Sequence, residues 1–181
     1  MPGHLVCVMG PSGAGKDTLI AYARARTDPA RVLYAHRYVT RAPEAGGENH
    51  VALSPAEFAA RRSAGLFALS WESHGLSYGI GAELDLWLGR GLTVVANLAR
   101  AAWGDARQRY PDLAGVLVTA AAEILAQRLA ARGREDPAAI AERMAREVAL
   151  PDDPAIHRID NSGDLAVAGE ALVRLLSAAP P

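Results

Sequence analysis

Runs of apolar residues alternate along the chain with amphipathic segments, and this alternation predicts an α/β fold. Nearly continuous apolar runs are typical of strands buried on both faces, and they predict strands at 4–9, 32–35, 92–96, 116–119 and 156–160. Apolar residues at helical spacing predict helices at 16–27, 54–64, 83–88, 99–110, 121–132, 137–149 and 164–177. Strands that alternate with helices favour a parallel sheet covered by helices on both sides.

Between the second and third predicted strands the alternation is interrupted. Residues 37–53 are polar and punctuated by Gly and Pro, so they are expected to form a loop. Ser54 followed by Glu57 matches a capping box, which predicts that a helix begins there. Residues 65–80 mix aromatic residues with Gly and predict a small β excursion. Because neither a repeat nor a long linker divides the sequence, we expect one domain over residues 1–181.

A glycine-rich segment separates the first predicted strand from the first predicted helix. It reads Gly-Pro-Ser-Gly-Ala-Gly-Lys at residues 10–16 and matches the G-x-x-x-x-G-K core of a P-loop. Glycines let backbone N–H groups surround phosphate oxygens, and the following helix points its positive end at the same anion. The segment therefore predicts an ATP site made by Gly10, Pro11, Ser12, Gly13, Ala14, Gly15, Lys16, Asp17 and Thr18.

The composition singles out Lys16. Of the 19 Lys and Arg residues, 18 are Arg, and Lys16 is the single Lys. An ammonium is a compact point charge, whereas a guanidinium is a planar fork. A chain that uses Arg elsewhere and Lys here is expected to need an ammonium beside the β- and γ-phosphates, where it neutralises charge during phosphoryl transfer.

The residues that usually support Mg²⁺ in a P-loop protein are altered. Asp17 stands where Ser or Thr is expected after the lysine, and Thr18 follows it. A carboxylate beside a triphosphate is repelled unless a cation or its water lies between them, so Asp17 and Thr18 are candidate Mg²⁺ contacts through water. Asp17 as a first-turn residue favoured by the helix dipole is an equal alternative. The strand expected to end in an acid ends in Asn97, which bonds a phosphate or a water without adding charge.

Charge and cysteine content narrow the class of protein. The net charge of -1 gives no reason to expect a nucleic acid or an anionic membrane as partner. Cys7 is the only cysteine, which excludes an intramolecular disulfide, and its apolar neighbours predict a buried, inert thiol. No signal peptide and no apolar run near the ~18 residues of a membrane helix is visible, so a cytoplasmic enzyme is expected.

Motifs along nearly the whole chain resemble those of guanylate kinases. The P-loop is followed in that family's order and spacing by Thr40-Arg41-Ala42-Pro43, Glu57-Phe58, Gly65-Leu66-Phe67, His74-Gly75 and Tyr78-Gly79. Arg128, Arg132 and Arg143 resemble the family's lid arginines. The resemblance implies an α/β P-loop kinase fold with a five-stranded parallel sheet flanked by helices. It also implies an acceptor-binding insertion at 37–80 and an arginine lid at 128–146.

Three positions depart from the guanylate kinase pattern. Glu44 replaces the family's second phosphate-gripping Arg, Leu69 falls on its guanine-reading Glu, and Ile80 falls on its Ser or Thr. Leu69 cannot accept a hydrogen bond from a guanine N–H. Since the loss of a specific polar contact discriminates strongly between substrates, GMP is not the expected acceptor.

The chain is similar instead to a sister family of bacterial phosphonate metabolism, the ribose 1,5-bisphosphate phosphokinases. The matching segments are Gly10–Asp17, Arg37–Arg41, Gly46–His50, His74–Leu76, Tyr78–Ile80, Asn97 and Asp160–Gly163. The resemblance implies transfer of the γ-phosphoryl group of ATP, with Mg²⁺, onto the 1-phosphate of ribose 1,5-bisphosphate. The products are 5-phosphoribosyl 1-diphosphate and ADP. Guanylate kinase and a non-catalytic module with this fold are the alternatives, and a homodimer is left open.

Roles for single residues follow from this chemistry. The acceptor phosphate is already anionic, so catalysis rests on positioning and charge neutralisation rather than on a strong base. The residues expected to act in catalysis are Lys16, Arg132 and Arg143, and those expected to contact the nucleotide beyond the P-loop are Arg128 and Asn161. The expected ligands of a small sugar bisphosphate are Arg37, Arg41, His74, Tyr78 and Asn97. A solvated loop is the alternative for Arg41, and a charged helix face is the alternative for the lid arginines.

Overall fold

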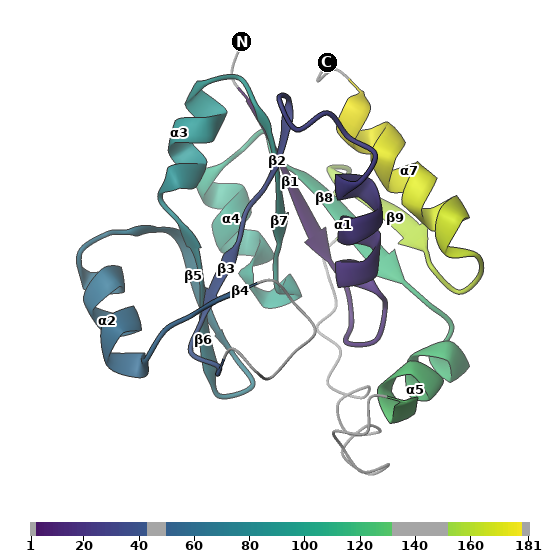
Figure 1. The fold of residues 1–181 in the computed structure, drawn as a ribbon, viewed down its shortest axis with the longest axis horizontal. Coiled ribbons are helices and arrows are strands. Elements are labelled where there is room, and N and C mark those ends of the chain that lie inside the picture. The colour runs from purple at the N-terminus through teal and green to yellow at the C-terminus, as the bar shows by residue number, and fades with distance from the viewer. Residues whose placement is uncertain (1–2, 43–49, 132–151, 179–181) are drawn as a thin grey trace.

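The structure is a computed structural model and describes residues 3–42, 50–131 and 152–178 (Figure 1). Its central sheet has five parallel strands, as the sequence predicted, in the order β2-β7-β1-β8-β9. In that order their bounds are Val32–Tyr34, Thr93–Asn97, His4–Met9, Ala114–Thr119 and Ile156–Asp160. Every strand of this sheet ends at the same edge, which is therefore the edge where loops from several strands meet.

The central strand β1 explains why helices cover both faces of the sheet. Alternate side chains of a strand point to opposite faces. Leu5, Cys7 and Met9 pack in one apolar cluster, and Val6 and Val8 pack in another. The helices packed on the Val6 side are α1 (Lys16–Arg24), α5 (Ala122–Ala131) and α7 (Leu165–Ser177). Those packed on the Leu5 side are α3 (Glu83–Gly89) and α4 (Trp103–Arg109), and the short 3-10 helix η2 (Arg100–Ala102) precedes α4.

A second sheet, in the order β4-β3-β6-β5, lies beside the first (Figure 1). Its strands span His50–Ala52, Arg37–Val39, Leu76–Gly81 and Phe67–Ser73 in that order. It shares an apolar cluster with the central sheet, because Val39 and Tyr78 pack together with Cys7 and Met9. The β excursion expected near 65–80 is thus confirmed as the β5–β6 hairpin.

The prediction of a loop over 37–53 is wrong in its described parts. β3 pairs antiparallel with β6, with Val39 opposite Tyr78, and parallel with β4. Each of these two strands has only three residues, which is too short to show a period of two in the sequence. β3 pairs with β6, which lies far along the chain, and β4 in turn pairs with β3.

The helix ends follow local capping. Ser54 accepts a hydrogen bond from the Glu57 N–H at 3.1 Å, so Ser54 is confirmed as the N-cap and α2 spans Pro55–Ser63. The Glu57 carboxylate accepts a hydrogen bond from Arg61 Nη2 at 2.7 Å. α1 ends at Arg24, earlier than expected, and Thr27 Oγ1 bonds the Ala23 carbonyl at 3.0 Å. The helix expected at 137–149 lies outside the described residues. No helix in the described parts of the chain combines the length and apolar character that a membrane span requires.

The reactivity of the Cys7 thiol can be used to test how tightly the core around β1 is packed. Its side chain has no exposed area, and burial raises the pKa of its thiol to about 12. The reactive thiolate is then nearly absent at neutral pH. We expect iodoacetamide to leave Cys7 unmodified in the folded protein and to alkylate it after denaturation, as read by mass spectrometry of the intact chain. Equal labelling in both states would contradict the packing around β1.

Candidate active site

The P-loop lies between the end of β1 at Met9 and the start of α1 at Lys16. Gly10 and Gly15 have φ values of 151° and 87°, which residues with a side chain rarely adopt. A Cβ on Gly10 would also collide with the Val118 carbonyl oxygen, and one on Gly15 would collide with Asn161 Nδ2. Both glycines are thus required by backbone conformation and by close neighbours.

Lys16 bends back over the P-loop. Its Nζ donates hydrogen bonds to the carbonyl oxygens of Gly10 at 2.9 Å and Pro11 at 3.0 Å. The side chain is half-buried. The ammonium is therefore held above the turn whose backbone N–H groups are expected to surround phosphate oxygens.

Asn161 is hydrogen-bonded to the P-loop and holds it in place. Its side chain is 3% exposed, and its Nδ2 donates to the Ala14 carbonyl oxygen at 2.7 Å. Its backbone N–H donates to the Thr119 carbonyl oxygen at 2.8 Å, at the end of β8. Asn161 thus ties the P-loop to the neighbouring strand ends, a role that the sequence did not indicate.

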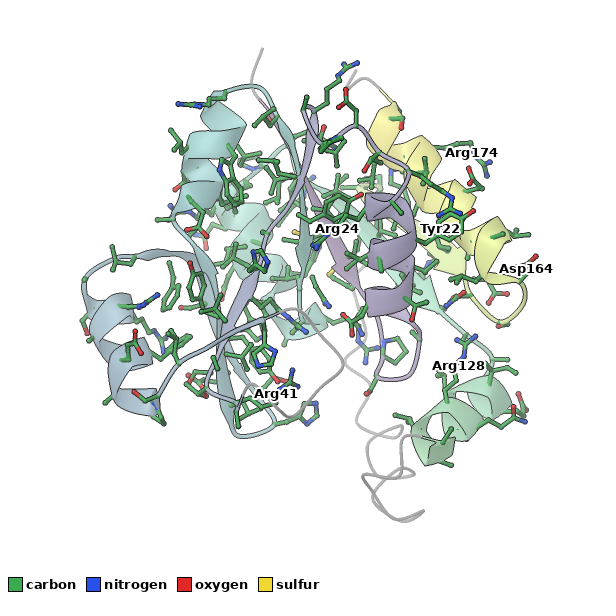
Figure 2. All side chains as sticks on the ribbon, in the orientation of Figure 1. Tyr22, Arg24, Arg41, Arg128, Asp164 and Arg174 are labelled. Atoms are coloured by element: carbon green, nitrogen blue, oxygen red, sulfur yellow. The ribbon has the colours of Figure 1, made fainter. Side chains whose placement is uncertain are left out.

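Arg128, on α5, extends toward Asn161 and the P-loop (Figure 2). Its Nη2 donates to the Asn161 carbonyl oxygen at 2.9 Å. Its Nη1 is buried, has no hydrogen-bond partner among the described residues, and lies 3.7 Å from where a Cβ of Gly15 would stand. This N–H group therefore faces the P-loop, where a phosphate oxygen would satisfy it.

Replacing Asn161 by alanine is expected to loosen the P-loop. The change removes the donor to the buried Ala14 carbonyl, and a buried acceptor left without a partner costs about 1–3 kcal/mol. We expect a lower midpoint of thermal unfolding together with weaker binding of a non-hydrolysable ATP analogue, measured by calorimetry. An unchanged midpoint and an unchanged affinity would show that the Asn161–Ala14 contact does not support the loop.

Asp17 and Asn97 meet where α1 begins and β7 ends. Asn97 Nδ2 donates to Asp17 Oδ1 at 2.8 Å. A carboxylate only accepts, so this bond fixes the orientation of the amide. Asn97 is 7% exposed, and its Oδ1 is buried without a hydrogen-bond partner among the described residues. Thr18, the other candidate near the metal, is exposed in the first turn of α1.

A pocket of about 430 Å³ opens beside this pair. Its lining comes from α1, from the ends of β2 and β7 and from the start of β3, and consists of Asp17, Ile20, Ala21, Arg24, Ala25, Tyr34, Ala35, Arg37, Val95 and Asn97. It brings together the predicted ligands Asp17, Arg37 and Asn97. It also contains Arg24 and Tyr34, which the sequence analysis missed. The sequence did contain a signal for Arg24, because Asp17, Ile20, Ala21 and Arg24 have the spacing of residues on one face of a helix.

The other predicted acceptor ligands lie on the second sheet and do not line this pocket. Arg41 Nη2 lies 3.4 Å from His50 Nδ1. Tyr78 is 9% exposed, and its ring stacks on Trp71 with centroids 5.6 Å apart. The Arg37 guanidinium lies over the same Tyr78 ring, 5.3 Å from its centroid. His74 is exposed at the turn of the β5–β6 hairpin with a φ of 52°.

Several predicted positions fall outside the described residues. They are Glu44, Arg132 and Arg143, together with most of the expected lid at 128–146. Within the described residues, no group of three or more His, Cys, Asp and Glu side chains is arranged to hold a metal ion.

Solved structures share this fold at low sequence identity. A guanylate kinase from Anaplasma phagocytophilum superposes with a TM-score of 0.71 at 15% identity, over 97% of this chain and 85% of that one. A sugar kinase from Janibacter sp. HTCC2649 superposes with a TM-score of 0.55 at 22% identity, over 99% of this chain and 97% of that one. These similarities confirm the P-loop kinase fold.

Curated relatives are much more similar in sequence. No family model matches the chain. The protein named ribose 1,5-bisphosphate phosphokinase PhnN from Desulfomicrobium baculatum is 55% identical over 174 residues, which cover 95% of this chain and 93% of that protein. The protein of the same name from Burkholderia pseudomallei is 53% identical over 175 residues, which cover 96% and 95%. The chain therefore belongs to the ribose 1,5-bisphosphate phosphokinase PhnN family.

Proposed function

We propose that this chain transfers the γ-phosphoryl group of ATP to the 1-phosphate of ribose 1,5-bisphosphate. The observation that carries the proposal is the 55% identity, over nearly the whole chain, to a relative named for this substrate. The P-loop and the pocket beside Asp17 and Asn97 support it, because they offer one site for a triphosphate and an adjoining site for a small acceptor.

The reaction forms one bond and breaks one. An oxygen of the acceptor's 1-phosphate attacks the γ-phosphorus, and the bond from that phosphorus to the oxygen bridging to the β-phosphate breaks. ADP leaves with the bridging oxygen, and the other product is 5-phosphoribosyl 1-diphosphate. Because the attacking oxygen is already anionic, no side chain has to remove a proton, and the protein contributes orientation and positive charge.

The nucleotide side of the site is assigned to the P-loop and its supports. Backbone N–H groups of residues 10–15, except Pro11, which has none, surround the phosphates, and Lys16 moves from the Gly10 and Pro11 carbonyls to the β- and γ-phosphates. Arg128 contributes its buried Nη1, and Asn161 holds Ala14 in place. The Lys16 ammonium neutralises negative charge on the phosphoryl group while it is transferred.

Magnesium fits this site as a companion of the nucleotide. When bound with ATP, Mg²⁺ would offset negative charge on the phosphates. Asp17, held by the Asn97 amide, and Thr18 are the residues that would contact its water ligands. Mg²⁺ keeps several waters in such sites, so a carboxylate one water away is sufficient.

The acceptor side is assigned to Arg37, Arg41, His74, Tyr78 and Asn97, within the insertion at 37–80 and at the end of β7. A guanidinium binds phosphate through two parallel hydrogen bonds, which suits Arg37 and Arg41. For Arg132 and Arg143, which lie outside the described residues, a catalytic role rests on the resemblance alone. Both would neutralise the charge on the transferring group.

The test is turnover of ATP with ribose 1,5-bisphosphate, and a reaction without acceptor is the blank. We expect 5-phosphoribosyl 1-diphosphate and ADP to form in equal amounts, as followed by phosphorus NMR and chromatography. ADP without the sugar diphosphate would indicate hydrolysis instead of transfer. A protein that binds ATP but turns over no acceptor would be a binding module with a kinase fold.

A further inference from the structure

One stripe of α1 faces a pocket instead of the core. Asp17, Ile20, Ala21 and Arg24 stand at positions i, i+3, i+4 and i+7, which share one face of a helix. Leu19 and Ala23, on the face beside it, are fully buried. The stripe is polar at its two ends and apolar between them. Along the axis its ends are about 10 Å apart, since a helix rises 1.5 Å per residue.

Arg24 is held in position and still offers its donors. Its guanidinium lies 4.9 Å from the centroid of the Tyr34 ring, and that ring is anchored by a 2.9 Å hydrogen bond from Tyr34 to Thr27. No carboxylate pairs with Arg24 in the described parts of the chain. Stacking leaves the N–H groups at the edge of the guanidinium available to a ligand in the pocket.

Arg26, two residues after Arg24, is also stacked on a tyrosine but does not line the pocket. Its guanidinium lies 3.6 Å from the centroid of the Tyr22 ring, and its Nε lies 3.7 Å from a carboxylate oxygen of Glu170 on α7. Figure 2 shows Arg24 and Tyr22 on opposite sides of α1, with Tyr22 toward α7. Both arginines are exposed and stacked on a tyrosine, but only Arg24 lines the pocket.

Arg37 is the second cation of the pocket. Its guanidinium lies over Tyr78, so it is positioned by an aromatic ring as Arg24 is by Tyr34. Two arginines that line one small pocket favour a phosphate, because a guanidinium binds a phosphate in a planar, bidentate manner. Asp17, at the other end of the stripe, repels a phosphate unless a cation lies between them, so a phosphate that no cation accompanies is favoured at the end that carries Arg24.

Asn97 indicates which chemical group the rest of the ligand must carry. Its Oδ1 is a buried acceptor that lacks a hydrogen-bond donor among the described residues, and its Nδ2 is already bonded to Asp17. A hydroxyl group supplies such a donor without bringing charge into the pocket. A ligand that suits these groups combines hydroxyls with a phosphate at a distance from them, as a sugar phosphate does.

We infer that this pocket is the subsite for the ribose ring and the non-reacting 5-phosphate of the acceptor. Arg24 and Arg37 bind the 5-phosphate, Asn97 accepts a hydrogen bond from a ribose hydroxyl, and the 1-phosphate is left at the P-loop end. The volume of about 430 Å³ suits a small ligand. The inference rests on the proposed function, since it assigns one part of the proposed acceptor.

The test compares Arg24→Gln with Arg26→Gln, which removes an equivalent stacked arginine outside the pocket. The probe is ribose 5-phosphate, which carries the 5-phosphate and lacks the reacting group, and its Kd is measured by calorimetry. Loss of a charged hydrogen bond costs about 1.5–3 kcal/mol, so we expect the Kd to rise about 10- to 100-fold in Arg24→Gln. In Arg26→Gln the Kd is expected to match that of the unmodified protein.

A second measurement separates this inference from the proposed function. With ribose 1,5-bisphosphate as acceptor, Arg24→Gln should raise the KM for the acceptor by a similar factor and leave the KM for ATP and the melting temperature unchanged. Normal turnover with an unchanged acceptor KM and an unchanged Kd for ribose 5-phosphate would overturn the subsite alone. Absent turnover, with ribose 5-phosphate still bound through Arg24, would overturn the proposed reaction and leave the subsite standing.

Discussion

Lys16→Met is expected to lower kcat by about a thousandfold while the protein stays folded. Removing one preorganised charge or donor from a transition state costs about 10²–10³ in rate, and Lys16 is expected to contact the group that carries the developing charge. Methionine keeps the length and apolar stem of the side chain and removes only the ammonium. The measurements are steady-state kinetics with ribose 1,5-bisphosphate and the thermal unfolding midpoint.

Lys16→Arg tests why the chain keeps one lysine among eighteen arginines. The ammonium donates to two carbonyl oxygens of the turn, at 2.9 Å from Gly10 and 3.0 Å from Pro11. A guanidinium is wider and planar, so it cannot occupy the same space above the turn. We expect Lys16→Arg to lose nearly as much activity as Lys16→Met. Activity close to normal in Lys16→Arg would show that charge alone is needed at this position.

The elements that the sequence predicted correctly are those encoded by consecutive residues. The P-loop needs one strand, six loop residues and one helix in direct succession, so its pattern is complete within residues 4–24. The inner strands β1, β7 and β8 of the central sheet are mostly buried and appear as apolar runs. β3 and β4, in contrast, are three residues long and depend on pairing with β6 or with each other.

The contacts that the sequence did not indicate join residues that are far apart along the chain. Asn161 bonds Ala14 across 147 positions, and Asn97 bonds Asp17 across 80. Asn97 was expected to bond a phosphate or a water. The structure shows that its amide nitrogen donates to Asp17, while its buried oxygen has no hydrogen-bond partner among the described residues. Such pairings depend on the order of strands in the sheet, which hydrophobic spacing does not encode.

Arg24 was missed for a related reason. In the sequence it is an exposed arginine near the end of a helix, and most arginines in that place are solvated. Its relevance comes from Tyr34 on β2, against which α1 places it, and from the pocket that both residues line. The helical spacing from Asp17 to Arg24 was visible, but the residues facing this stripe were known only once β2 and β7 were placed beside α1.

The choice of acceptor is expected to show the largest effect. We predict that kcat/KM for ribose 1,5-bisphosphate exceeds that for GMP by about 10⁴, the range seen when a site lacks the polar partner that a substrate requires. Leu69 and Ile80 are register partners in β5 and β6, and they are 6% and 1% exposed. The resemblance places the guanine-reading groups of guanylate kinases at these two positions. Neither side chain accepts a hydrogen bond from guanine.

The charges of Arg37 and Glu44 also favour a sugar bisphosphate over GMP as the acceptor. Arg37 is the register partner of Ile80 on the other side of β6, so a guanidinium stands one strand away from the apolar pair. Glu44, outside the described residues, carries a charge opposite to that of the arginine that the resemblance places there in guanylate kinases, and at that place it would repel a nucleotide phosphate. A sugar bisphosphate has no base whose edge must be satisfied. It requires two separate anion sites, and we propose that Arg24 and Arg37 in the pocket form the site for its 5-phosphate.

The comparison is made by measuring kcat/KM for both acceptors at saturating ATP, in the unmodified protein and in two variants. Leu69→Glu restores the carboxylate of the guanylate kinase pattern and is expected to raise the GMP rate at the expense of stability, because a buried carboxylate is costly. Leu66→Glu adds the same charge at a position that is 52% exposed and should change neither rate. If GMP is the better acceptor of the unmodified protein, Leu69 does not exclude guanine and the chain is a divergent guanylate kinase.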